Sequence, residues 1–464
     1  MTTALPTGCT GCPSGVLARA DLVSYFRART TAARRVSPRV GIEYELLPVD
    51  PATGRAWPYG GPRGVEAALR ELLAVGGFVD PTEAPHPIDV RRAELSINLE
   101  PGAQTELSGT PFESLADVRA ELDAHLALLR GVADRLGFCY LGYGVQPVSL
   151  AGEIEPIPKP RYALMVDHFE RYGGRRALDM MRRTASLQAS LDYEDEADAG
   201  RKLRVSMAAA PAATALFAHS PIAGGRATGR LSTRAEIWRE TDDARCGLIP
   251  QVLEGPPEEA FGRYVDYALS VPLLFIRRGG RLRPAGGRRF VDFLREGLDG
   301  ERPTMEDFEL HLSTIFTVSR LKGIVEVRSA DGPRPGEAMA IPAFWLGLLG
   351  SRVTLEAAWE ALGGGSVATA DRSALLDRAA REGLAARLEA AGGSRSAAAG
   401  GRRLRDQALD LIAIARDGLR ARGRDEEAFL APAEEIARTG ETAAERRLAE
   451  WGGDIGRLVA ACRL

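Results

Sequence analysis

Hydrophobic and polar positions alternate in several short segments, which is the pattern of β-strands with one buried face. In residues 40–46 the apolar positions enclose two glutamates, Glu43 and Glu45. The pattern returns in residues 95–100 and, after Pro101-Gly102, in residues 104–108, which predicts two strands joined by a turn. Residues 184–192 and 323–329 are further predicted strands.

Apolar residues at helical spacing predict helices over residues 64–75, 111–136 and 305–318. Thr110, Pro111 and Glu113 have the spacing of a capping box, so we expect the second helix to start just after Thr110. Thr304 is the expected cap of the third. The prolines in residues 152–162 predict an extended loop, and helical sequence dominates after about residue 352.

These segments predict three parts of the chain. Residues 1–20 are expected to be a flexible tail, in which Cys9 and Cys12 lack the second Cys/His pair of a zinc site. Residues 21–350, which contain the predicted strands, are expected to form one large domain. Residues 351–464 are expected to form a helical region, with a flexible loop near residues 391–401 that is rich in Gly, Ser and Ala.

Composition excludes several classes of partner. The 464 residues carry 60 Lys+Arg and 63 Asp+Glu, a net charge of −3, which argues against a nucleic-acid binder. The longest apolar stretch, residues 338–350, contains Pro342 and is shorter than the ~20 residues of a membrane span. The N-terminus has no pattern of a secretory signal, and five scattered cysteines do not suggest a disulfide framework. We therefore expect a cytoplasmic protein.

Common catalytic motifs are also absent from the sequence. None of the three lysines is followed by Ser or Thr, so no Walker A loop is present. No serine has glycine at both the minus-two and plus-two positions, and no His-Glu-x-x-His pair occurs. The glycine clusters do not form the Gly-x-Gly-x-x-Gly pattern of a dinucleotide site.

Glutamates occupy alternate positions of the predicted strands. If the strand faces converge, two carboxylates about 4 Å apart repel by roughly 4 kcal/mol at an effective dielectric of 20, and a cation must compensate. Mg²⁺ accepts carboxylate oxygens and completes its shell with water and phosphates, so the pattern suggests an ATP–magnesium site. The alternative is a solvated polar face of antiparallel strands. The glutamates are Glu43, Glu45, Glu94, Glu100, Glu106 and Glu326.

Four arginines lie beside polar or glycine-containing segments and not on a plain charged helix face: Arg183, Arg234, Arg245 and Arg328. A guanidinium matches carboxylate and phosphate groups bidentately, so an arginine opposite an acidic metal site can anchor an anionic substrate. A structural ion pair is the alternative for each of them.

Eight segments together resemble the plant-type glutamate–cysteine ligase family. They keep the family's order over residues 40–350. The segments are GIEYE at 41–45, LEPGAQTELSG at 99–109, PKPRY at 158–162, DMMRRT at 179–184, ATALFAHSP at 213–221, RAEIWRETD at 234–242, HLSTIF at 311–316 and EVRSADG at 326–332.

The resemblance implies an α+β fold, in which helices pack on a curved, mainly antiparallel sheet similar to the catalytic domain of glutamine synthetase. It implies ATP and Mg²⁺ as cofactors and L-glutamate and L-cysteine as substrates, joined through a γ-glutamyl phosphate. It also implies roles for individual residues. The implied metal ligands are Glu43, Glu45, Glu100, Glu106 and Glu326; the implied catalytic residues are Arg234, Arg245 and Arg328; and the implied substrate-binding residues are Arg183, Arg234, Arg245 and Lys159.

Some features depart from the family or stay open. The cysteines do not match the regulatory cysteine pairs of the plant enzymes. His219-Ser220-Pro221 is expected to shape a turn. The region after residue 351 matches poorly, and its role could be to cover the active site or to form a homodimer. A ligase with a different amine acceptor, or a non-catalytic ATP-binding protein of the same fold, remains an alternative.

Overall fold

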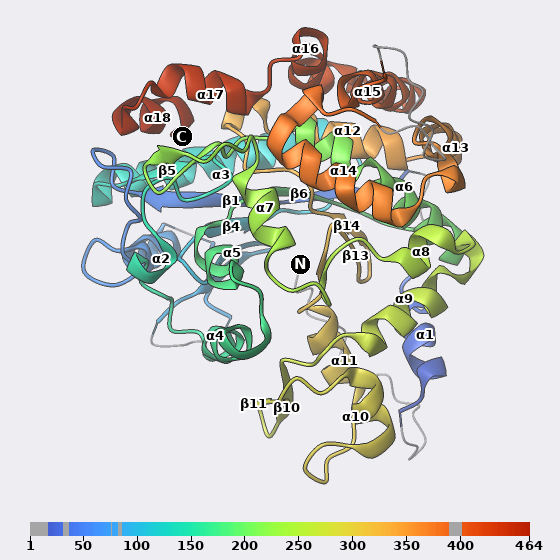
Figure 1. The fold of residues 1–464 in the computed structure, drawn as a ribbon. Coiled ribbons are helices and arrows are strands. Elements are labelled where there is room, and N and C mark those ends of the chain that lie inside the picture. The colour runs from blue at the N-terminus through green and yellow to red at the C-terminus, as the bar shows by residue number, and fades with distance from the viewer. Residues whose placement is uncertain (1–16, 31–36, 76, 82–85, 389–400) are drawn as a thin grey trace.

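The protein is built around one antiparallel sheet that helices cover (Figure 1). The computed structural model describes residues 17–30, 37–75, 77–81, 86–388 and 401–464. The strand order is β13-β14-β6-β1-β4-β3-β2, with β5 paired to β1, and every pair in this sheet is antiparallel. Its strands are β1 (Val40–Val49), β2 (Asp89–Arg92), β3 (Leu95–Leu99), β4 (Thr105–Ser108), β5 (Cys139–Leu141), β6 (Leu187–Leu191), β13 (Ser319–Leu321) and β14 (Val325–Val327).

In the ranges that the structure describes, three two-stranded pairings lie outside this sheet. They are the antiparallel pairs β7 (Ile222–Ala223) with β8 (Arg226–Ala227) and β10 (Phe275–Arg278) with β11 (Arg281–Pro284), and the parallel pair β9 (Cys246–Gly247) with β12 (Phe316–Thr317).

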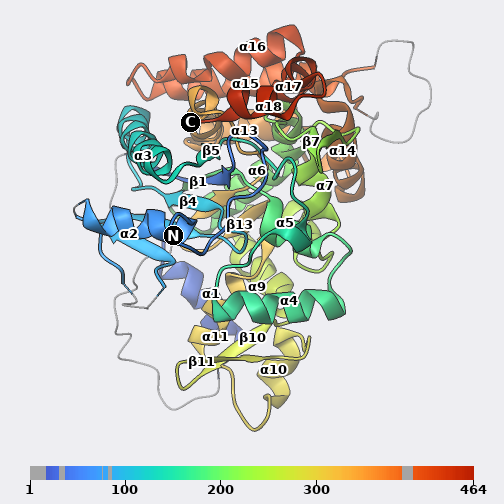
Figure 2. The same ribbon diagram turned by 90° about the vertical axis from the view of Figure 1, so that its left-hand side faces the viewer.

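Helices lie on both sides of the sheet, and the helices α15 to α18 of the C-terminal region gather on one of these sides (Figure 2). Those before residue 350 are α1 (Arg19–Arg27), α2 (Val65–Ala74), α3 (Leu115–Leu136), α4 (Pro160–Tyr172), α5 (Ala177–Arg183), α6 (Glu196–Leu216), α7 (Thr233–Arg239), α8 (Pro250–Glu254), α9 (Ala260–Ser270), α10 (Phe290–Glu296), α11 (Met305–Leu312) and α12 (Ala340–Leu349). Those after it are α13 (Arg352–Ala361), α14 (Thr369–Glu382), α15 (Leu404–Ala421), α16 (Ala431–Thr439), α17 (Ala443–Trp451) and α18 (Ile455–Cys462).

Within the described residues, six short 3₁₀ helices connect these elements: η1 (Ala151–Glu153), η2 (Pro257–Glu259), η3 (Pro335–Glu337), η4 (Gly364–Ser366), η5 (Gly383–Ala385) and η6 (Glu427–Leu430).

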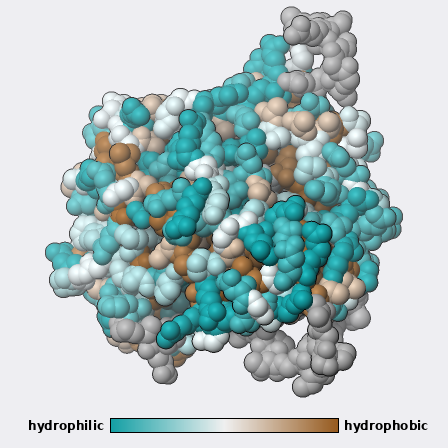
Figure 3. All heavy atoms as spheres, turned by 60° about the horizontal axis from the view of Figure 1, so that its bottom comes forward, coloured by the Kyte–Doolittle hydropathy of each residue, from teal (hydrophilic) through white to brown (hydrophobic). Residues whose placement is uncertain are grey.

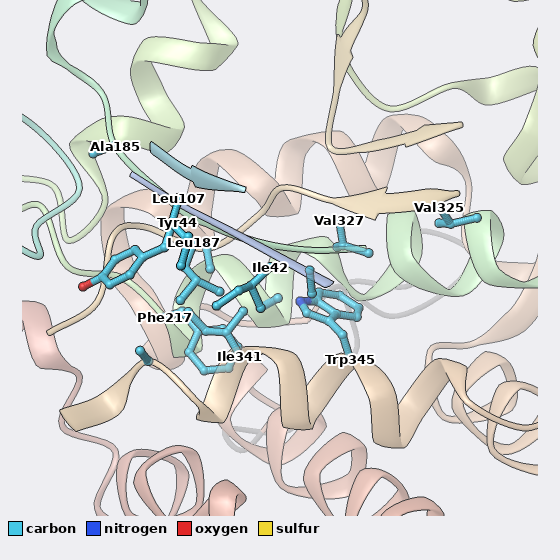
Figure 4. Close-up of a cluster of buried hydrophobic side chains, with 14 of the residues drawn as sticks. Ile42, Tyr44, Leu107, Ala185, Leu187, Phe217, Val325, Val327, Ile341 and Trp345 are labelled. Carbon is cyan, nitrogen blue, oxygen red and sulfur yellow. The ribbon is translucent and has the colours of Figure 1, made fainter. Parts of the chain in front are cut away.

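The apolar face of the sheet forms the centre of the core. Ile42 and Tyr44 of β1 and their neighbours on β4, β6 and β14 lie beside Ile341 and Trp345 of α12 (Figure 4). Every residue of α12 is buried, as expected for a helix that is apolar all round. The side of the molecule that lies at the bottom of Figure 1 is mostly hydrophilic, and its apolar surface is broken into small patches (Figure 3).

The predicted α+β class is confirmed, because helices pack on an antiparallel sheet.

The strand predictions of the first half of the chain are confirmed at β1, β3 and β4, as is the helix over residues 64–75. The strands expected over residues 184–192 and 323–329 are shorter, as β6 and β14. Helices also dominate after residue 352, as predicted. The division into domains at residue 350 stays a prediction, and the loop near residues 391–401 falls mostly outside the described ranges.

The capping-box prediction at Thr110 is wrong. Helix α3 begins at Leu115, and the hydroxyl of Ser114 caps it by accepting from the amide of Ala116. The reason is tertiary, because Phe112 exchanges two backbone hydrogen bonds with Val40, at 2.8 and 3.0 Å. That pairing holds the backbone around Phe112 extended. The helix therefore starts four residues later than expected.

Three other boundaries differ from expectation. Helix α4 begins at Pro160, so the proline-rich loop is shorter than residues 152–162, and proline fits the first helical turn. Helix α11 is capped by Thr304 as predicted but ends at Leu312, because residues 316–317 pair with β9 instead. Helix α1 starts at Arg19, inside the predicted tail, whose first 16 residues lie outside the description.

Among the helices described, none is by itself long and apolar enough to cross a membrane. The segments Pro335–Leu349 and Arg352–Ser366 pass that test only as a pair bent by 98°, judged on length and composition. The first contains the buried helix α12.

Candidate active site

The face of the sheet opposite the α12 core carries the predicted carboxylates. Glu45 on β1 lies directly opposite Glu106 on β4, and Glu43 lies opposite Ser108 on one side and Gln188 on the other. On β14, Glu326 lies opposite Ser190 of β6. Because side chains two residues apart share one face of a strand, these groups converge on a single surface, as the alternation predicted.

The carboxylates on this face act on one another. Burial and then the Glu100 carboxylate raise the pKa of Glu45 to about 7. Burial, followed by Glu43, Glu100 and Glu45, raises the pKa of Glu106 well above its ordinary value. Few hydrogen bonds offset this repulsion: Ser186 donates to Glu45 at 2.9 Å and Ser108 to Glu106 at 3.2 Å. A divalent cation would relieve the repulsion.

Two of the predicted carboxylates lie elsewhere or at the edge. Glu100 follows β3, half-buried, and its charge reaches both Glu45 and Glu106. Glu94 lies in the turn between β2 and β3 and is exposed, so it does not belong to the converging set. The alternation predicted Glu94 on the strand face, because the two predicted strands did not include β2 or the β2–β3 turn.

Glu326 is enclosed by cations. Arg320 donates to both of its carboxylate oxygens, at 2.7 and 3.0 Å, while Lys322 lies at 3.2 Å and Arg328 at 2.9 Å. Burial alone would raise the pKa of Glu326, but these three cations hold it well below its usual range. A carboxylate so fully paired has little charge left for a metal ion, so its surroundings favour an ion-pair role over the predicted ligand role.

The sequence interpretation missed Arg320 and Lys322. Both lie on the same β13–β14 hairpin as Glu326, and Arg320 is its register partner across the hairpin. A signal was present, since Arg320, Lys322 and Glu326 are spaced for cross-strand and diagonal contacts around the turn. The alternation predicts a strand only over residues 323–329, which leaves out Arg320 and Lys322.

Arg234 and Arg328 lie together beside the carboxylates, as predicted. Arg328 donates to Gln188 at 2.5 Å, and Arg234 donates to the backbone oxygen of Arg328 at 3.1 Å. Both guanidinium groups lower the pKa of Glu45, against the larger effect of burial. The structure thus brings two of the four predicted arginines to the acidic face.

These two arginines line a hollow of about 500 Å³, which we call the Trp238 hollow. Its lining consists of Thr214, Arg234, Ala235, Trp238, Arg239, Gly247, Phe316, Thr317, Val318, Arg328, Ser329 and Leu376. Among the residues that the structure describes, three buried atoms of this lining have no hydrogen-bond partner: Arg234 Nε, Trp238 Nε1 and Ser329 Oγ. A buried donor without a partner is costly, so these groups fit a ligand that accepts hydrogen bonds.

Arg245 and Arg183 are not part of this group. Arg245 is fully buried and donates to Asp242 at 2.5 Å and to the carbonyls of Thr314 and Pro272 at 3.1 and 2.9 Å. Arg183 donates to Asp179 at 2.9 Å and to the carbonyl of Gln146. The donors of Arg245, and both terminal nitrogens of Arg183, bond to groups of the fold, although Arg183 Nε has no partner among the described residues. The structural alternative therefore describes the two arginines better than the predicted catalytic and substrate-binding roles.

Lys159 lies near enough to Glu100 and Glu106 for their charges to act on it. It immediately precedes α4, and its ammonium lies 4.9 Å from the ring centre of Tyr162. Burial lowers the pKa of Lys159, while Glu100 opposes the shift. Arg161, which the sequence interpretation did not single out, is also near Glu100 and donates to the hydroxyl and carbonyl oxygens of Ser313 at 3.0 and 3.1 Å.

The donor set fits magnesium without forming a closed metal cage. Within the described ranges, no three His, Cys, Asp or Glu side chains are grouped so that they could hold a metal ion by themselves. Mg²⁺ usually needs only one or two protein carboxylates, because water and substrate phosphates supply the remaining oxygens. The facing, mutually repelling carboxylates of Glu45 and Glu106 provide such a pair.

An antiparallel sheet whose polar face gathers carboxylates and arginines defines an enzyme that handles anionic substrates. The comparison with known families is specific: residues 39–461 match the model described as glutamate-cysteine ligase family 2. The chain belongs to this family.

Curated relatives support the same assignment. The chain is 36% identical to the chloroplastic glutamate–cysteine ligase of Nicotiana tabacum over 448 residues, which is 96% of this chain and 81% of the relative. It is 37% identical over 448 residues to the corresponding protein of Brassica juncea, with 96% and 83% coverage. Because the match spans nearly the whole chain, it includes the region after residue 351, where the sequence motifs gave a poor match.

A solved structure supports the fold. The glutamate–cysteine ligase of Francisella tularensis in complex with AMP superimposes with a TM-score of 0.55 and 12% identity, covering 92% of this chain and 89% of that one. At this identity the likeness concerns architecture alone. The expected fold, an open curved sheet similar to that of glutamine synthetase, is confirmed.

Proposed function

We propose that the protein joins the γ-carboxylate of L-glutamate to the amine of L-cysteine at the expense of ATP. The products are γ-glutamylcysteine, ADP and phosphate, with a γ-glutamyl phosphate as intermediate. Family membership supports the proposal. The observation that carries it is the pairing of the half-buried Glu45 with the buried Glu106 next to Arg234 and Arg328, which places metal-type and anion-type binding groups on one face.

The carboxylates of Glu45 and Glu106 would hold Mg²⁺ together with water and phosphate oxygens, and the nearby charges of Glu43 and Glu100 would favour the cation. Bound there, Mg²⁺ would neutralise phosphate charge and make phosphoryl transfer to a carboxylate easier. Glu326 is left outside this set, because it already pairs with Arg320, Lys322 and Arg328. In the proposal it holds Arg328 in place.

The cations of the face bind and orient the anionic substrates. Arg234 and Arg328 line the Trp238 hollow and suit the α-carboxylate of glutamate, or the phosphates of ATP. Lys159, near Glu100, suits a phosphate. Bidentate contacts from these arginines to the α-carboxylate or the phosphates would orient the γ-carboxylate for in-line attack on ATP. Such positioning, with stabilisation of charge, supplies most of the rate enhancement of phosphoryl transfer.

The experiment that tests the proposal measures ADP release by the purified protein. Release should require ATP, Mg²⁺, glutamate and cysteine together, and mass spectrometry should identify γ-glutamylcysteine. Turnover with a non-thiol amine that equals the turnover with cysteine would instead support the different amine acceptor. Absence of any glutamate-dependent ADP release would contradict the ligase assignment.

Location and assembly are proposed on the sequence pattern alone. We propose a cytoplasmic protein that forms a homodimer and supplies γ-glutamylcysteine for a low-molecular-weight thiol such as glutathione. The plant relatives carry the description chloroplastic, which is a statement about those proteins. Cell fractionation and light scattering of the purified protein test these two points.

A further inference from the structure

Asp331 is a buried carboxylate close to the active site that has no place in the mechanism above. It follows Arg328 by three residues, just beyond β14, and is 2% exposed. Three groups donate to it: the hydroxyl of Ser220 at 2.6 Å, the amide of His219 at 2.8 Å and the hydroxyl of Ser232 at 2.8 Å. Its two oxygens therefore connect the loop before β7 with the segment that opens α7.

The two serines pass this connection on to α7. Ser232 is the N-cap of that helix and accepts from the amide of Ala235 at 3.0 Å. The hydroxyl of Ser220 accepts from the amide of Arg234 at 3.1 Å. The amides at the second and third positions of α7 are thus both capped by hydroxyls that donate to one carboxylate, which strengthens each bond.

Arg234 is the residue that this arrangement positions. Its backbone amide is fixed through Ser220, while its side chain donates to the carbonyl of Arg328, in the same segment that carries Asp331. The Asp331 charge also acts on the Arg234 guanidinium. One carboxylate therefore links the backbone positions of Arg234 and Arg328, two of the three arginines that line the Trp238 hollow.

The surrounding backbone leaves room for this carboxylate and for little else. A Cβ atom on Gly144 would lie 2.7 Å from Cγ of Asp331, closer than non-bonded carbon atoms approach. Asp331 and Gly144 are thus packed against each other, and a methyl group at residue 144 would displace the carboxylate.

We propose that Asp331 is a positioning residue that sets Arg234, through Ser220 and Ser232, to bind the glutamate substrate. The inference rests on the proposed function and deepens it. Ser220 accordingly acts as a hydrogen-bonding group that connects Asp331 with the amide of Arg234. This role is consistent with the turn expected for His219-Ser220-Pro221.

The test compares Asp331→Asn with a matched control, Asp307→Asn. Asp307 is also buried, caps α11 by accepting from Thr304, and pairs with Arg278, away from the Trp238 hollow. We expect Asp331→Asn to raise the KM for glutamate about tenfold, the size of a lost charge-assisted contact, with the KM for ATP within about twofold. Asp307→Asn should lower the melting temperature and leave both KM values within about twofold.

Gly144→Ala provides a second route to the same result, because it displaces the carboxylate without removing it. It should give the same separation between the two KM values. Equal KM changes for glutamate and ATP in the Asp331→Asn enzyme, or none relative to Asp307→Asn, would overturn the inference while the wild-type activity still upheld the ligase assignment.

A measurement without substrates separates the two proposals further. Hydrogen exchange of the amides of Arg234 and Ala235 should become faster in Asp331→Asn and stay unchanged in Asp307→Asn, whether or not the wild-type protein is a ligase. Unchanged protection in Asp331→Asn would overturn the positioning role by itself.

Discussion

Glu45 and Glu106 lie directly opposite each other across β1 and β4 on the polar face of the sheet. Two facing carboxylates in a buried setting are unfavourable unless one binds a proton or a cation lies between them. Burial and the neighbouring carboxylates raise the pKa of both. The fold therefore leaves the repulsion between these two carboxylates uncompensated. A bound metal ion with its nucleotide would relieve that repulsion.

Replacing either carboxylate by its amide should separate activity from stability. We expect Glu45→Gln and Glu106→Gln to lower kcat by about 100-fold or more, since each removes a metal-type ligand. The same substitutions should leave the melting temperature without Mg²⁺ unchanged or higher, because they remove like-charge repulsion. Steady-state ADP release and thermal unfolding check the two effects.

Glu94→Gln is the matched control for this pair, because Glu94 is exposed in the β2–β3 turn. It should retain wild-type kcat. Full turnover by Glu45→Gln and Glu106→Gln would rule out the metal site on this face.

Arg234 and Arg245 should respond differently to the same conservative change. Arg234→Lys should reduce kcat/KM for glutamate about 100-fold, because a lysine cannot reproduce a bidentate contact. Arg245→Lys should instead lower the free energy of unfolding, since Arg245 bonds Asp242 and two buried carbonyls, and leave the KM for glutamate within about twofold. Kinetics and urea titration of both variants decide the matter; a selective rise of the glutamate KM in Arg245→Lys would restore its predicted substrate role.

The Arg320–Glu326 pair should be important for stability. Arg320→Met leaves the buried Glu326 with fewer partners and should cost about 3–5 kcal/mol of unfolding free energy. The exposed i,i+4 pair of Arg119 and Asp123 is the control, and Arg119→Met should cost less than about 1 kcal/mol. Urea denaturation measures both; equal small losses would mean that Lys322 and Arg328 alone satisfy Glu326.

Buried histidines should make the protein sensitive to acid. Burial lowers the pKa of His125 to about 3, and neither ring nitrogen has a hydrogen-bond partner in the part of the chain that the structure describes. The unfolded chain gains a proton near pH 6.5 that the folded chain does not, so stability is full above pH 6.5 and falls as pH decreases towards 3. The contribution of this one histidine is lost at about 1.4 kcal/mol per pH unit.

His125→Leu should remove that part of the acid sensitivity. Between pH 7.5 and 5.5 the variant should lose about 1.4 kcal/mol less than the wild type in urea denaturation. Identical pH slopes for His125→Leu and wild type would show that His125 is not held neutral by the fold.

The elements predicted best from the sequence are those whose periodicity follows from local burial. Strand β1 and helix α3 show their apolar spacing directly, so their type and most of their length are readable. The start of α3 was not readable, because Phe112 pairs with Val40, more than seventy residues away. A cap motif at Thr110 competes with that pairing and loses, as local propensity often does to tertiary contacts.

The candidate site shows the same division. Alternation by itself placed Glu43, Glu45 and Glu106 on one face of their strands, because side-chain direction in a strand is a local property. Which strands are neighbours, and hence that Glu45 faces Glu106, depends on the register of β1 with β4. The partners of each arginine are likewise long-range: Arg234 meets Arg328, whereas Arg245 meets the carbonyls of Thr314 and Pro272.

The sequence by itself determined the kinds of element, the acidic strand faces and, through its motifs, the family. Only the tertiary structure decided which charges are satisfied by the fold and which are left for ligands. Glu326 and Arg245 belong to the first group and Glu45, Glu106 and Arg234 to the second. The physical reason is that a charge is satisfied by groups within a few ångströms in space, and those groups come from distant parts of the chain.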